Sequence, residues 1–273
     1  TDPDADRLGV YAKDKNTGNY IPFTGNMSGL LIAEYQLSQK QSKGILPENG
    51  ALVKTIVSSE MAKEMAEYYH VHLIEVLTGF KYIGEQIKWF EEQGNYQYLF
   101  GYEESYGCLL GTYARDKDAV SAVAGLCEAA AFYRQQGGTL WDQMQNIYKK
   151  YGCYKEELLS VTLKGVEGSE KIQHILQRLR EEPPAMLGDS RVIAFRDYQK
   201  GVRHDLVHQT DSALELPKSN VLYYELENRS WCCVRPSGTE PKVKFYFGVK
   251  ASDMQKAEEH IEALRRAAQK IIE

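Results

Sequence analysis

The sequence predicts an α/β protein in which a mixed α/β domain built from βαβ units precedes a smaller antiparallel α+β domain. In the first half of the chain, β-branched runs alternate with helical patterns, an order typical of a mostly parallel sheet. In the second half, several strands follow one another with alternating apolar and polar residues, which favours an antiparallel sheet. Gly152, at the end of a helical pattern, marks the expected domain boundary.

Turn residues and apolar periodicity divide the first half into its elements. A turn at Asn16–Asn19 ends a short strand, and Gly137 and Gly138 end a long helix. Thr139 with Asp142 resembles a capping box for the next helix. The predicted strands are Leu8–Lys13, Ala51–Ser59, His72–Leu77 and Tyr96–Gly101, and the predicted helices are Met27–Gln39, Ser59–His70, Asp118–Gln135 and Thr139–Gly152.

The long helix over Asp118–Gln135 is expected to bury one apolar stripe. Its apolar residues recur every three or four positions, which is the spacing of a single helix face. The residues of this stripe are Val120, Val123, Ala124, Cys127, Ala130 and Ala131.

The second half is predicted to pack helices on an antiparallel sheet. The helix Ser169–Arg180 has apolar residues at helical spacing, and a final helix repeats them from Met254 to Ile271. The last strand alternates cleanly between an apolar and a polar face. The predicted strands are Arg191–Tyr198, Asn220–Asn228, Ser230–Pro236 and Lys242–Lys250.

Composition limits the partners and the location. The net charge of −5 does not favour nucleic acid or an anionic membrane as a partner. No charged-then-apolar leader and no run of about 18 apolar residues is present, so neither a signal peptide nor a membrane span is predicted. An odd number of cysteines without Cys-x-x-Cys spacing argues against a disulfide framework or a zinc site. We therefore expect the protein to lie in the reducing cytoplasm, with its cysteines unpaired. These are Cys108, Cys127, Cys153, Cys232 and Cys233.

Three alternating aspartates, Asp2, Asp4 and Asp6, form a candidate site for a hard cation. An EF-hand is excluded, because Arg7 and Lys13 stand where that motif needs glycine and glutamate. The position of Arg7 beside three carboxylates suggests that an anionic ligand enters as well, so that the metal bridges to phosphate. The alternative is an acidic, solvated turn.

The stretch Arg235–Pro241 (RPSGTEP) lies between two strong strands and suits a phosphate. Ser237, Gly238 and Thr239 offer backbone N–H groups and two hydroxyls in a tight loop, and Arg235 adds a charged fork. A plain hairpin turn is the alternative, and the spacing does not match a Walker loop.

The stretch Gly101–Gly107 (GYEESYG) follows a predicted parallel strand, where open α/β sheets bind ligands. Glu103 with Ser105 could bind two neighbouring sugar hydroxyls. General acid–base catalysis by Glu103 or Glu104 is possible, but no histidine lies near them in the sequence. A surface loop remains an alternative. Lys117, before the long helix, and Thr78–Gly79, after the strand His72–Leu77, read in isolation as solvated or capping residues.

The stretch His204–His208 (HDLVH) imitates the spacing of a zinc protease. That motif needs a helix to place both imidazoles on one face, and the flanking residues do not have a helical apolar pattern. Metal binding is not expected there.

In this order, the loops resemble those of the α-D-phosphohexomutases, the family of phosphoglucomutases and phosphomannomutases, over essentially the whole chain. TDPDADR resembles the family's magnesium loop, TGFK and GYEESYG its sugar-recognition loops, and RPSGTEP its phosphate-binding loop. The local sequence, GYEESYG followed by RDKDAV, is most similar to that of the larger bacterial α-phosphoglucomutases. The family's phosphoserine stretch, a serine followed by His-Asn-Pro, is absent from these 273 residues.

The resemblance implies the domain organisation. Residues 1–21 would be the tail of the second mutase domain with the magnesium loop, 22–153 the third domain and 154–273 the fourth. The chain would then be the C-terminal half of a mutase that interconverts hexose 1-phosphate and 6-phosphate through a phosphoserine and a bisphosphate intermediate. Its partners would be a phosphosugar and the missing N-terminal domains, and the chain alone is expected to be inactive.

The resemblance also implies roles for individual residues. Mg²⁺ would be held by Asp2, Asp4 and Asp6, and the residues that act at the reacting phosphoryl group would be Arg7 and Lys117. The sugar would be bound by Thr78, Gly79, Glu103 and Ser105. The other phosphate would be bound by Arg235, Ser237, Gly238 and Thr239.

Three other functions stay open on the residues. A phosphopentomutase of the same family and a non-catalytic phosphosugar-binding module both agree with the sugar and phosphate loops. An aspartate-nucleophile phosphatase would want threonine or valine in place of Asp6 and leaves RPSGTEP unexplained.

Overall fold

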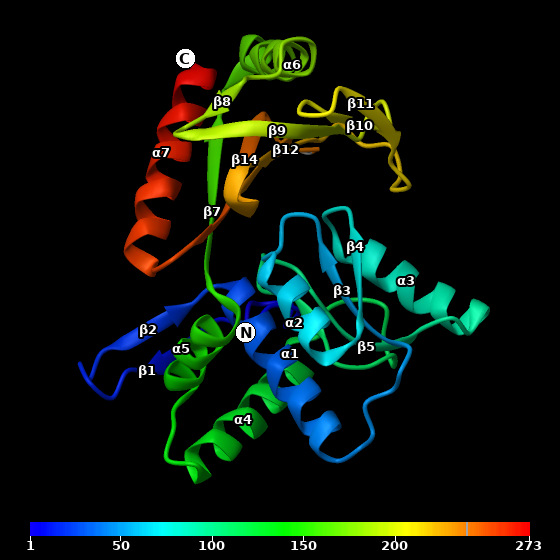
Figure 1. The fold of residues 1–273 in the computed structure, drawn as a ribbon, viewed down its shortest axis with the longest axis vertical. Coiled ribbons are helices and arrows are strands. Elements are labelled where there is room, and N and C mark those ends of the chain that lie inside the picture. The colour runs from blue at the N-terminus through cyan, green and yellow to red at the C-terminus, as the bar shows by residue number, and fades with distance from the viewer. Residues whose placement is uncertain (239) are drawn as a thin grey trace. The chain divides into compact units, whose positions relative to one another are not determined.

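The computed structural model describes residues 1–238 and 240–273, which form two compact units, Thr1–Gly152 and Cys153–Glu273. Each unit has its own sheet and its own helices (Figure 1). Among the described residues, no helix combines the length and the apolar character needed to cross a membrane.

A four-stranded sheet lies at the centre of the first unit, in the order β4–β3–β5–β6. The strands β3 (Gly50–Thr55), β4 (His72–Val76) and β5 (Gln97–Tyr102) are parallel, and β6 (Cys108–Leu109) is antiparallel to β5. Every residue of β3 is buried, as expected for a parallel strand that is covered on both faces. The predicted, mostly parallel sheet is confirmed.

Helices cover both faces of this sheet. On β5, Gly101 packs against Ile83 of α3 (Phe80–Gln93), and the next residue, Tyr102, points to the other face and packs against Gly29 of α1 (Gly25–Ser42). The helix α2 (Met61–Tyr69) follows β3. The sequence prediction omitted α3, although its buried residues recur at helical spacing: Phe80, Ile83, Ile87 and Phe90.

A hairpin and two further helices complete the first unit. The strands β1 (Val10–Lys13) and β2 (Tyr20–Phe23) form a separate two-stranded antiparallel sheet. The helix α4 (Ala119–Gln135) is capped by Asp118, and α5 (Leu140–Tyr151) begins with the predicted capping box of Thr139 and Asp142. That capping box is confirmed.

The apolar stripe predicted for α4 is wrong by one residue. The side of α4 that faces the protein carries Ala119, Ala122, Leu126, Ala129 and Tyr133. In the predicted stripe, Val120 is 68% exposed and Val123 is 38% exposed, and Cys127 is exposed as well. Two neighbouring stripes of this helix are both apolar, so periodicity alone could not say which one is buried.

The second unit is built on an antiparallel sheet in the order β11–β10–β9–β12–β13–β14–β7, with β8 paired to β9. The predicted antiparallel arrangement is confirmed, but β7, β8, β10 and β11 were not predicted. The strands are β7 (Cys153–Thr162), β8 (Met186–Leu187), β9 (Ser190–Asp197), β10 (Val202–Asp205), β11 (Thr210–Ala213), β12 (Leu222–Leu226), β13 (Trp231–Pro236) and β14 (Lys242–Ala251), and a short 3₁₀ helix, η1 (Glu227–Arg229), joins β12 to β13.

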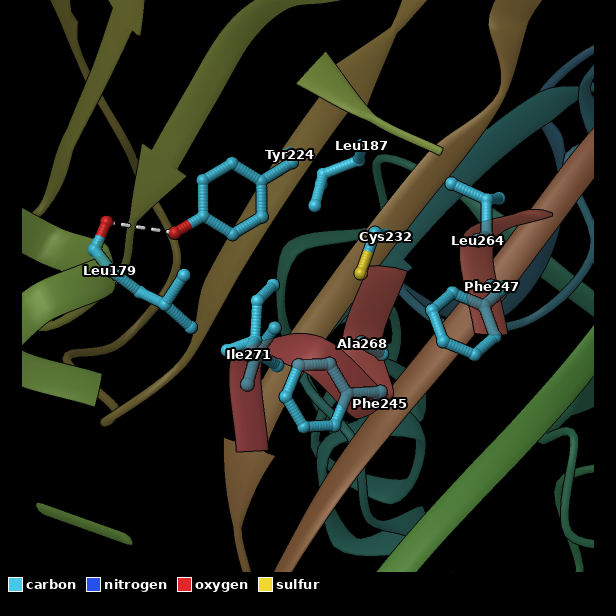
Figure 2. A pocket seen from close by; sticks show the side chains of 10 residues that line it. Leu179, Leu187, Tyr224, Cys232, Phe245, Phe247, Leu264, Ala268 and Ile271 are labelled. Atoms are coloured by element: carbon cyan, nitrogen blue, oxygen red, sulfur yellow. Dashed lines mark hydrogen bonds between the residues drawn. The ribbon is translucent and has the colours of Figure 1, made fainter. Parts of the chain in front are cut away.

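The helices α6 (Gly165–Glu181) and α7 (Met254–Ile272) close the core of the second unit (Figure 2). Tyr224 donates a hydrogen bond of 2.9 Å from its hydroxyl to the carbonyl oxygen of Leu179 on α6. The side chains around it leave no room for a water molecule between them. The apolar face predicted for the last strand is confirmed, because Val243, Phe245, Phe247 and Val249 are at most 2% exposed. The alternation is incomplete, because Tyr246 on the predicted polar face is buried as well.

Candidate functional site

The predicted site residues of the first unit gather where the parallel strands end. β3 ends at Thr55, β4 at Val76 and β5 at Tyr102, and the sequences TGFK and GYEESYG follow the last two strands directly. Loops at the carboxyl ends of parallel strands share one edge of a sheet, which is where open α/β sheets bind ligands.

The three aspartates form one compact group. One carboxylate oxygen from each of Asp2, Asp4 and Asp6 lies within 4.8 Å of the others. The carboxylate of Asp2 also accepts hydrogen bonds from the backbone N–H groups of Asp6 (3.2 Å) and Arg7 (3.0 Å). The hydrogen bond from Arg7 lowers the pKa of Asp2, so its carboxylate stays ionised. Backbone hydrogen bonds therefore curl the loop and bring the carboxylates together.

This group fits a hard divalent cation. The Oδ1 atom of Asp6 is buried and accepts no hydrogen bond from a described residue, and Arg7 Nε lies 3.7 Å away. A buried carboxylate oxygen without a donor is costly unless a cation satisfies it. Oxygen ligands from several carboxylates are those that Mg²⁺ and Ca²⁺ prefer. Within the described part of the chain, these aspartates form the one group of three or more acidic, histidine or cysteine side chains close enough to hold a metal.

Backbone contacts hold the aspartate loop beside GYEESYG and α4. The N–H of Leu8 donates to the carbonyl oxygen of Tyr106 (3.2 Å), and Arg7 forms an isolated antiparallel bridge with Gly107. The N–H of Ala119, the first residue of α4, donates to the carbonyl oxygen of Ala5 (3.1 Å). Three segments that are far apart in sequence are thus fixed at one place.

Lys117 lies inside this site and not in solvent. Its side chain is 14% exposed, and Nζ lies 2.9 Å from Oδ2 of Asp6 and 5.9 Å from the centre of the Phe80 ring. Burial alone would lower the pKa of Lys117, but the hydrogen bond to Asp6 and the charge of Glu103 outweigh it, so the pKa is raised. The ammonium therefore stays protonated, and the reading of Lys117 as a solvated charge is wrong.

Glu103 is a buried carboxylate that faces the same group. It is 6% exposed, and this burial raises its pKa against the opposing effects of a hydrogen bond from Ser105 and the charges of Lys117 and Arg7. A Cβ atom on Gly107 would lie 2.4 Å from Cδ of Lys117 and 3.1 Å from a carboxylate oxygen of Glu103. Glycine at 107 is therefore what allows these two side chains to lie so close to the backbone.

Glu104 points into the protein, away from Glu103. Its carboxylate accepts a hydrogen bond of 3.0 Å from Oγ1 of Thr55, which lies 2.8 Å from Oγ of Ser58. Thr55 and Ser58 are both fully buried. On the other side, the carbonyl oxygen of Glu104 would be 2.2 Å from a Cβ atom at Gly25, so α1 packs directly on the loop backbone. Glu104 thus anchors the loop to the end of β3.

Thr78 and Gly79 lie half-buried between β4 and α3. Gly79 has φ +118°, a conformation that side chains other than hydrogen rarely allow, and it sets the start of α3. The next residue, Phe80, provides the ring that faces Lys117. The TGFK stretch is therefore connected to the aspartate and glutamate loops through Lys117.

The RPSGTEP loop belongs to the second unit, where it joins β13 to β14. The N–H of Ser237 donates to the carbonyl oxygen of Lys242 (2.8 Å), and Gly238 is exposed at the loop tip. Thr239, the remaining residue predicted to bind phosphate, lies outside the described residues. Arg235, the charged fork of this loop, is half-buried on β13.

Lys244 is a candidate ligand that the sequence analysis missed. It is the cross-strand partner of Arg235, and both point to the sheet face opposite to the buried Val243 and Phe245. Two positive charges on the same face of adjacent strands can both contact one bound anion. The strand register, which a single loop sequence does not reveal, is the signal that identifies Lys244.

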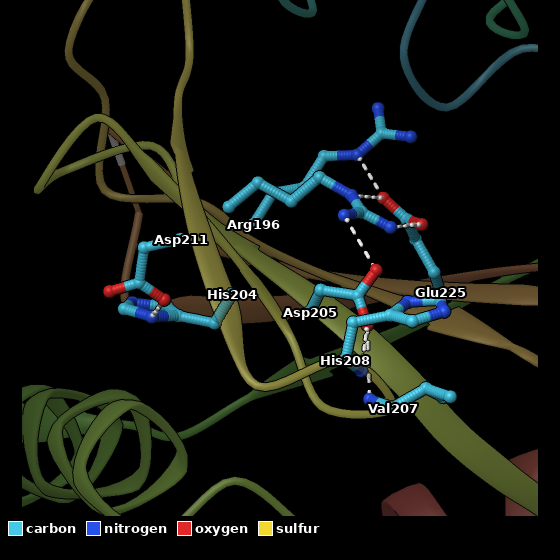
Figure 3. A network of polar contacts seen from close by, with 8 residues as sticks. Arg196, His204, Asp205, Val207, His208, Asp211 and Glu225 are labelled. Carbon is cyan, nitrogen blue, oxygen red and sulfur yellow. Dashed lines mark hydrogen bonds and ion pairs between the residues drawn. The ribbon is translucent and has the colours of Figure 1, made fainter.

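The HDLVH stretch belongs to a polar network (Figure 3). His204 is in a strand, β10, and its Nδ1 lies 2.7 Å from Asp211, whereas His208 Nδ1 lies 3.1 Å from Asp205. The two imidazoles are therefore paired with separate carboxylates. The expectation that they do not form the helical zinc motif is confirmed.

Residues 24–151 match the sequence profile of phosphoglucomutase/phosphomannomutase, alpha/beta/alpha domain III. A curated phosphoglucomutase from Staphylococcus epidermidis (strain ATCC 35984) is 39% identical over 249 residues, which is 91% of this chain and 44% of the relative. The chain thus spans somewhat less than half the length of that relative.

Solved structures share the fold. A phosphoglucomutase from Paramecium, pp63/parafusin in its open form, has a TM-score of 0.67 at 18% identity and covers 98% of this chain and 43% of its own. An N-acetylphosphoglucosamine mutase from Aspergillus fumigatus, solved with GlcNAc-6P and magnesium, has a TM-score of 0.52 at 15% identity and covers 99% of this chain and 48% of its own. From the matching domain profile, the related sequence and the shared fold, we conclude that the chain belongs to the phosphoglucomutase/phosphomannomutase family, the α-D-phosphohexomutases.

Proposed function

We propose that this chain supplies the metal, sugar and phosphate contacts of a mutase that interconverts hexose 1-phosphate and hexose 6-phosphate. The observation that carries the proposal is the gathering of Asp6, Lys117 and Glu103 at one edge of the parallel sheet. Glucose is the first candidate sugar, because the curated relative is named a phosphoglucomutase.

In this proposal, Glu103 and Ser105 bind neighbouring ring hydroxyls, and Thr78 and Gly79 border the sugar. The buried carboxylate of Glu103 can accept two hydroxyl hydrogen bonds, and binding a polar ligand relieves the cost of burying its charge. The anchor of Glu104 on Thr55 keeps the backbone between Glu103 and Ser105 in place.

Asp2, Asp4 and Asp6 would hold Mg²⁺, the metal present in the Aspergillus enzyme of the same fold. When bound, Mg²⁺ would neutralise charge on the phosphoryl group that is transferred. Arg7 and Lys117 place two further positive charges beside the same carboxylates. Because Lys117 stays protonated, it can stabilise negative charge or donate a proton, but it cannot accept one.

The second phosphate would be held by the RPSGTEP loop. Arg235 and Lys244 supply two positive charges on adjacent strands, and Ser237 and Gly238 supply polar groups of the loop, together with Thr239. Holding the phosphate that does not react fixes the orientation of the sugar ester.

Family resemblance assigns the nucleophile to a phosphoserine outside these residues. In the reaction, the bond from the serine oxygen to phosphorus breaks, a sugar oxygen forms a bond to that phosphorus, and the proton of the sugar hydroxyl ends on the released serine oxygen. The bisphosphate then turns and returns its other phosphate to the serine. We therefore expect the chain alone to bind phosphosugar without turning it over.

Two measurements test the proposal. Glucose 1,6-bisphosphate, added to the isotope-labelled chain, should shift the backbone NMR signals of Glu103, Ser105 and Lys117, and Glu103→Gln should weaken the shifts while Glu67→Gln, on the exposed face of α2, should not. Shifts elsewhere, or equal effects of both variants, would contradict the proposed sugar site. In a coupled assay with glucose 1-phosphate and the bisphosphate, turnover comparable to that of an intact phosphoglucomutase would contradict the missing nucleophile.

We also expect Mg²⁺ to bind weakly to the chain alone, because the ammonium of Lys117 already lies against the carboxylate of Asp6 and repels a second cation. Calorimetry should show a dissociation constant of about 1 mM or weaker, which corresponds to about −4 kcal/mol or less. Micromolar affinity would show that the ammonium does not oppose the metal.

A further inference from the structure

Lys117 lies near the end of a segment that has no regular secondary structure. Residues 110–118 connect β6 to α4, which begins at Ala119. Segments of this kind open easily unless other elements hold them. The 2.9 Å contact between Lys117 and Asp6 therefore requires contacts that fix the segment from outside.

The guanidinium of Arg115 binds its own turn and the helix α3 at the same time. Its Nη1 donates to the backbone carbonyl oxygens of Thr112 (2.5 Å) and Ala114 (3.1 Å). Its Nη2 lies 2.5 Å from Oε2 of Glu91, in the last turn of α3. The guanidinium can serve both sides because its five donors are held in one rigid, planar fork. Arg115 thus ties the turn 112–115 to α3.

The backbone of Arg115 packs on the same helix. A Cβ atom on Gly84, which is buried in α3, would lie 2.3 Å from the carbonyl oxygen of Arg115. Any larger residue at 84 would collide with this oxygen, so the close approach depends on glycine. Gly84 and Glu91 are about two helical turns apart, so α3 holds Arg115 at two separate points.

The first turn of α3 reaches the candidate site itself. Phe80 begins the helix directly after Thr78 and Gly79, and the centre of its ring lies 5.9 Å from Nζ of Lys117. A helix of this length is a rigid element, so its start and its end move together. The contacts of α3 with Arg115 therefore fix Lys117 relative to the TGFK stretch.

We propose that Arg115 is a positioning residue of the candidate site, which holds the turn 112–115 on α3 and thereby keeps the ammonium of Lys117 at the carboxylate of Asp6. Arg115 itself stands outside the ligand contacts of the proposed function. The inference deepens that function and rests on it in one respect: an effect on phosphosugar binding follows only if Lys117 acts at the reacting phosphoryl group.

The alternative is an ordinary surface ion pair. The side chains of Arg115 and Glu91 are 43% and 49% exposed, and exposed pairs contribute little to the free energy of unfolding. Arg115→Ala should therefore lower the melting temperature of the first unit by less than about 3 °C in either case. The position of Lys117 is the property that separates the two interpretations.

The first experiment measures how often Lys117 leaves Asp6. The chain is acetylated briefly with acetic anhydride in metal-free buffer, and each lysine is quantified by mass spectrometry relative to exposed Lys63 on α2. Acetylation of Lys117 should be about three- to fivefold faster in Arg115→Ala, because the reagent reaches Nζ when the segment opens. The NMR cross-peaks between the side chain of Lys117 and the ring of Phe80 should weaken in parallel.

Two further variants distinguish positioning from a general loss of structure. Glu92→Ala removes an ion pair to Lys88 (3.6 Å) within the same helix, and it should leave the acetylation of Lys117 unchanged. Combining Glu91→Ala with Arg115→Ala should accelerate acetylation no more than Arg115→Ala does, because the pair is already broken. Unchanged acetylation in Arg115→Ala, an equal effect of Glu92→Ala, or faster acetylation of every lysine in the first unit would overturn the proposal.

Gly84→Ala tests the backbone contact. Alanine is normally the more stable residue inside a helix, so the melting temperature would rise if the space beside Gly84 were open. The collision with the carbonyl oxygen of Arg115 should instead lower the melting temperature by about 4 °C or more and accelerate acetylation of Lys117. A rise in the melting temperature with unchanged acetylation would contradict the close packing of the turn on α3.

The last measurement separates this inference from the proposed function. Titration with glucose 1,6-bisphosphate, followed by NMR, should show about three- to fivefold weaker binding to Arg115→Ala than to the unsubstituted chain. Faster acetylation with unchanged binding would support the positioning of Lys117 and contradict its role at the phosphoryl group. Unchanged acetylation, together with weaker binding to Glu103→Gln, would overturn the role of Arg115 and leave the sugar site standing.

Discussion

Replacing Thr55 by valine tests whether Glu104 anchors the GYEESYG loop or acts as an acid in the candidate site. Valine keeps the shape of threonine and removes the hydroxyl that donates to Glu104 at 3.0 Å. Because Thr55 is fully buried, water cannot replace the lost donor from its side.

The expected cost follows from the two contacts that are lost. A hydrogen bond to a charged group contributes about 1.5–3 kcal/mol, and the half-buried carboxylate of Glu104 can recover part of this from water. Ser58, whose Oγ lies 2.8 Å from Thr55, loses a neutral contact of about 1 kcal/mol. The total of about 2–3 kcal/mol corresponds to a fall of about 5–10 °C in the melting temperature of a unit of this size.

The assay follows the first unit alone. Trp89 and Trp141 lie in that unit, so urea unfolding is monitored by fluorescence in a Trp231→Phe background, which silences the second unit. The control is Thr112→Val, an exposed threonine. With Glu104→Gln, a double-mutant cycle should give a coupling energy above about 1 kcal/mol with Thr55→Val. If the destabilising effects of Thr55→Val and Glu104→Gln add within about 0.5 kcal/mol, Glu104 does not anchor the loop through Thr55.

Three further predictions concern the sites and the core. Burial raises the pKa of Glu103, so at pH 7 its carboxylate opposes folding; Glu103→Gln should raise the melting temperature of the first unit by about 1–3 °C, and a fall would contradict burial as the dominant effect on this carboxylate. Lys244→Ala should weaken binding of inorganic phosphate to the chain about five- to tenfold, whereas Lys256→Ala on α7 should not; equal effects would remove Lys244 from the site. Burial raises the pKa of the Cys108 thiol to about 12, so at alkaline pH the thiol ionises in the unfolded chain but not in the folded one. The free energy of unfolding should therefore be unaffected below about pH 8.5 and should fall between about pH 9 and 12. Over that range, the urea midpoint of Cys108→Ser should fall less than that of the unsubstituted chain.

The fold was predictable where a residue pattern had one interpretation. The run around Val53 is apolar and β-branched throughout, and it forms a parallel strand that is buried on both faces. The strand β7 was missed because its pattern is mixed: Lys155 and Glu157 point to α7, where they pair with Glu258 and Arg265. Such pairs put charged residues on the face that packs against a helix, and alternation of apolar residues then disappears.

The candidate site was predictable as a set of loops but not as a set of contacts. The aspartates, Glu103 and Lys117 were all identified from their motifs, yet their sequence positions say nothing of the 2.9 Å contact between Lys117 and Asp6. The direction of Glu104 depends on the end of β3, 49 residues away. Contacts between segments distant in sequence are fixed by the sheet, and a local motif does not contain them.

The contact between Lys117 and Asp6 gives the site an internal counter-ion. The ammonium pairs with Oδ2 of Asp6, so a divalent cation at Oδ1 would lie beside its positive charge and bind more weakly. A phosphate that binds at the same time would neutralise part of both positive charges and remove that penalty. Metal and phosphosugar should therefore load synergistically, each raising the affinity of the other by the same factor.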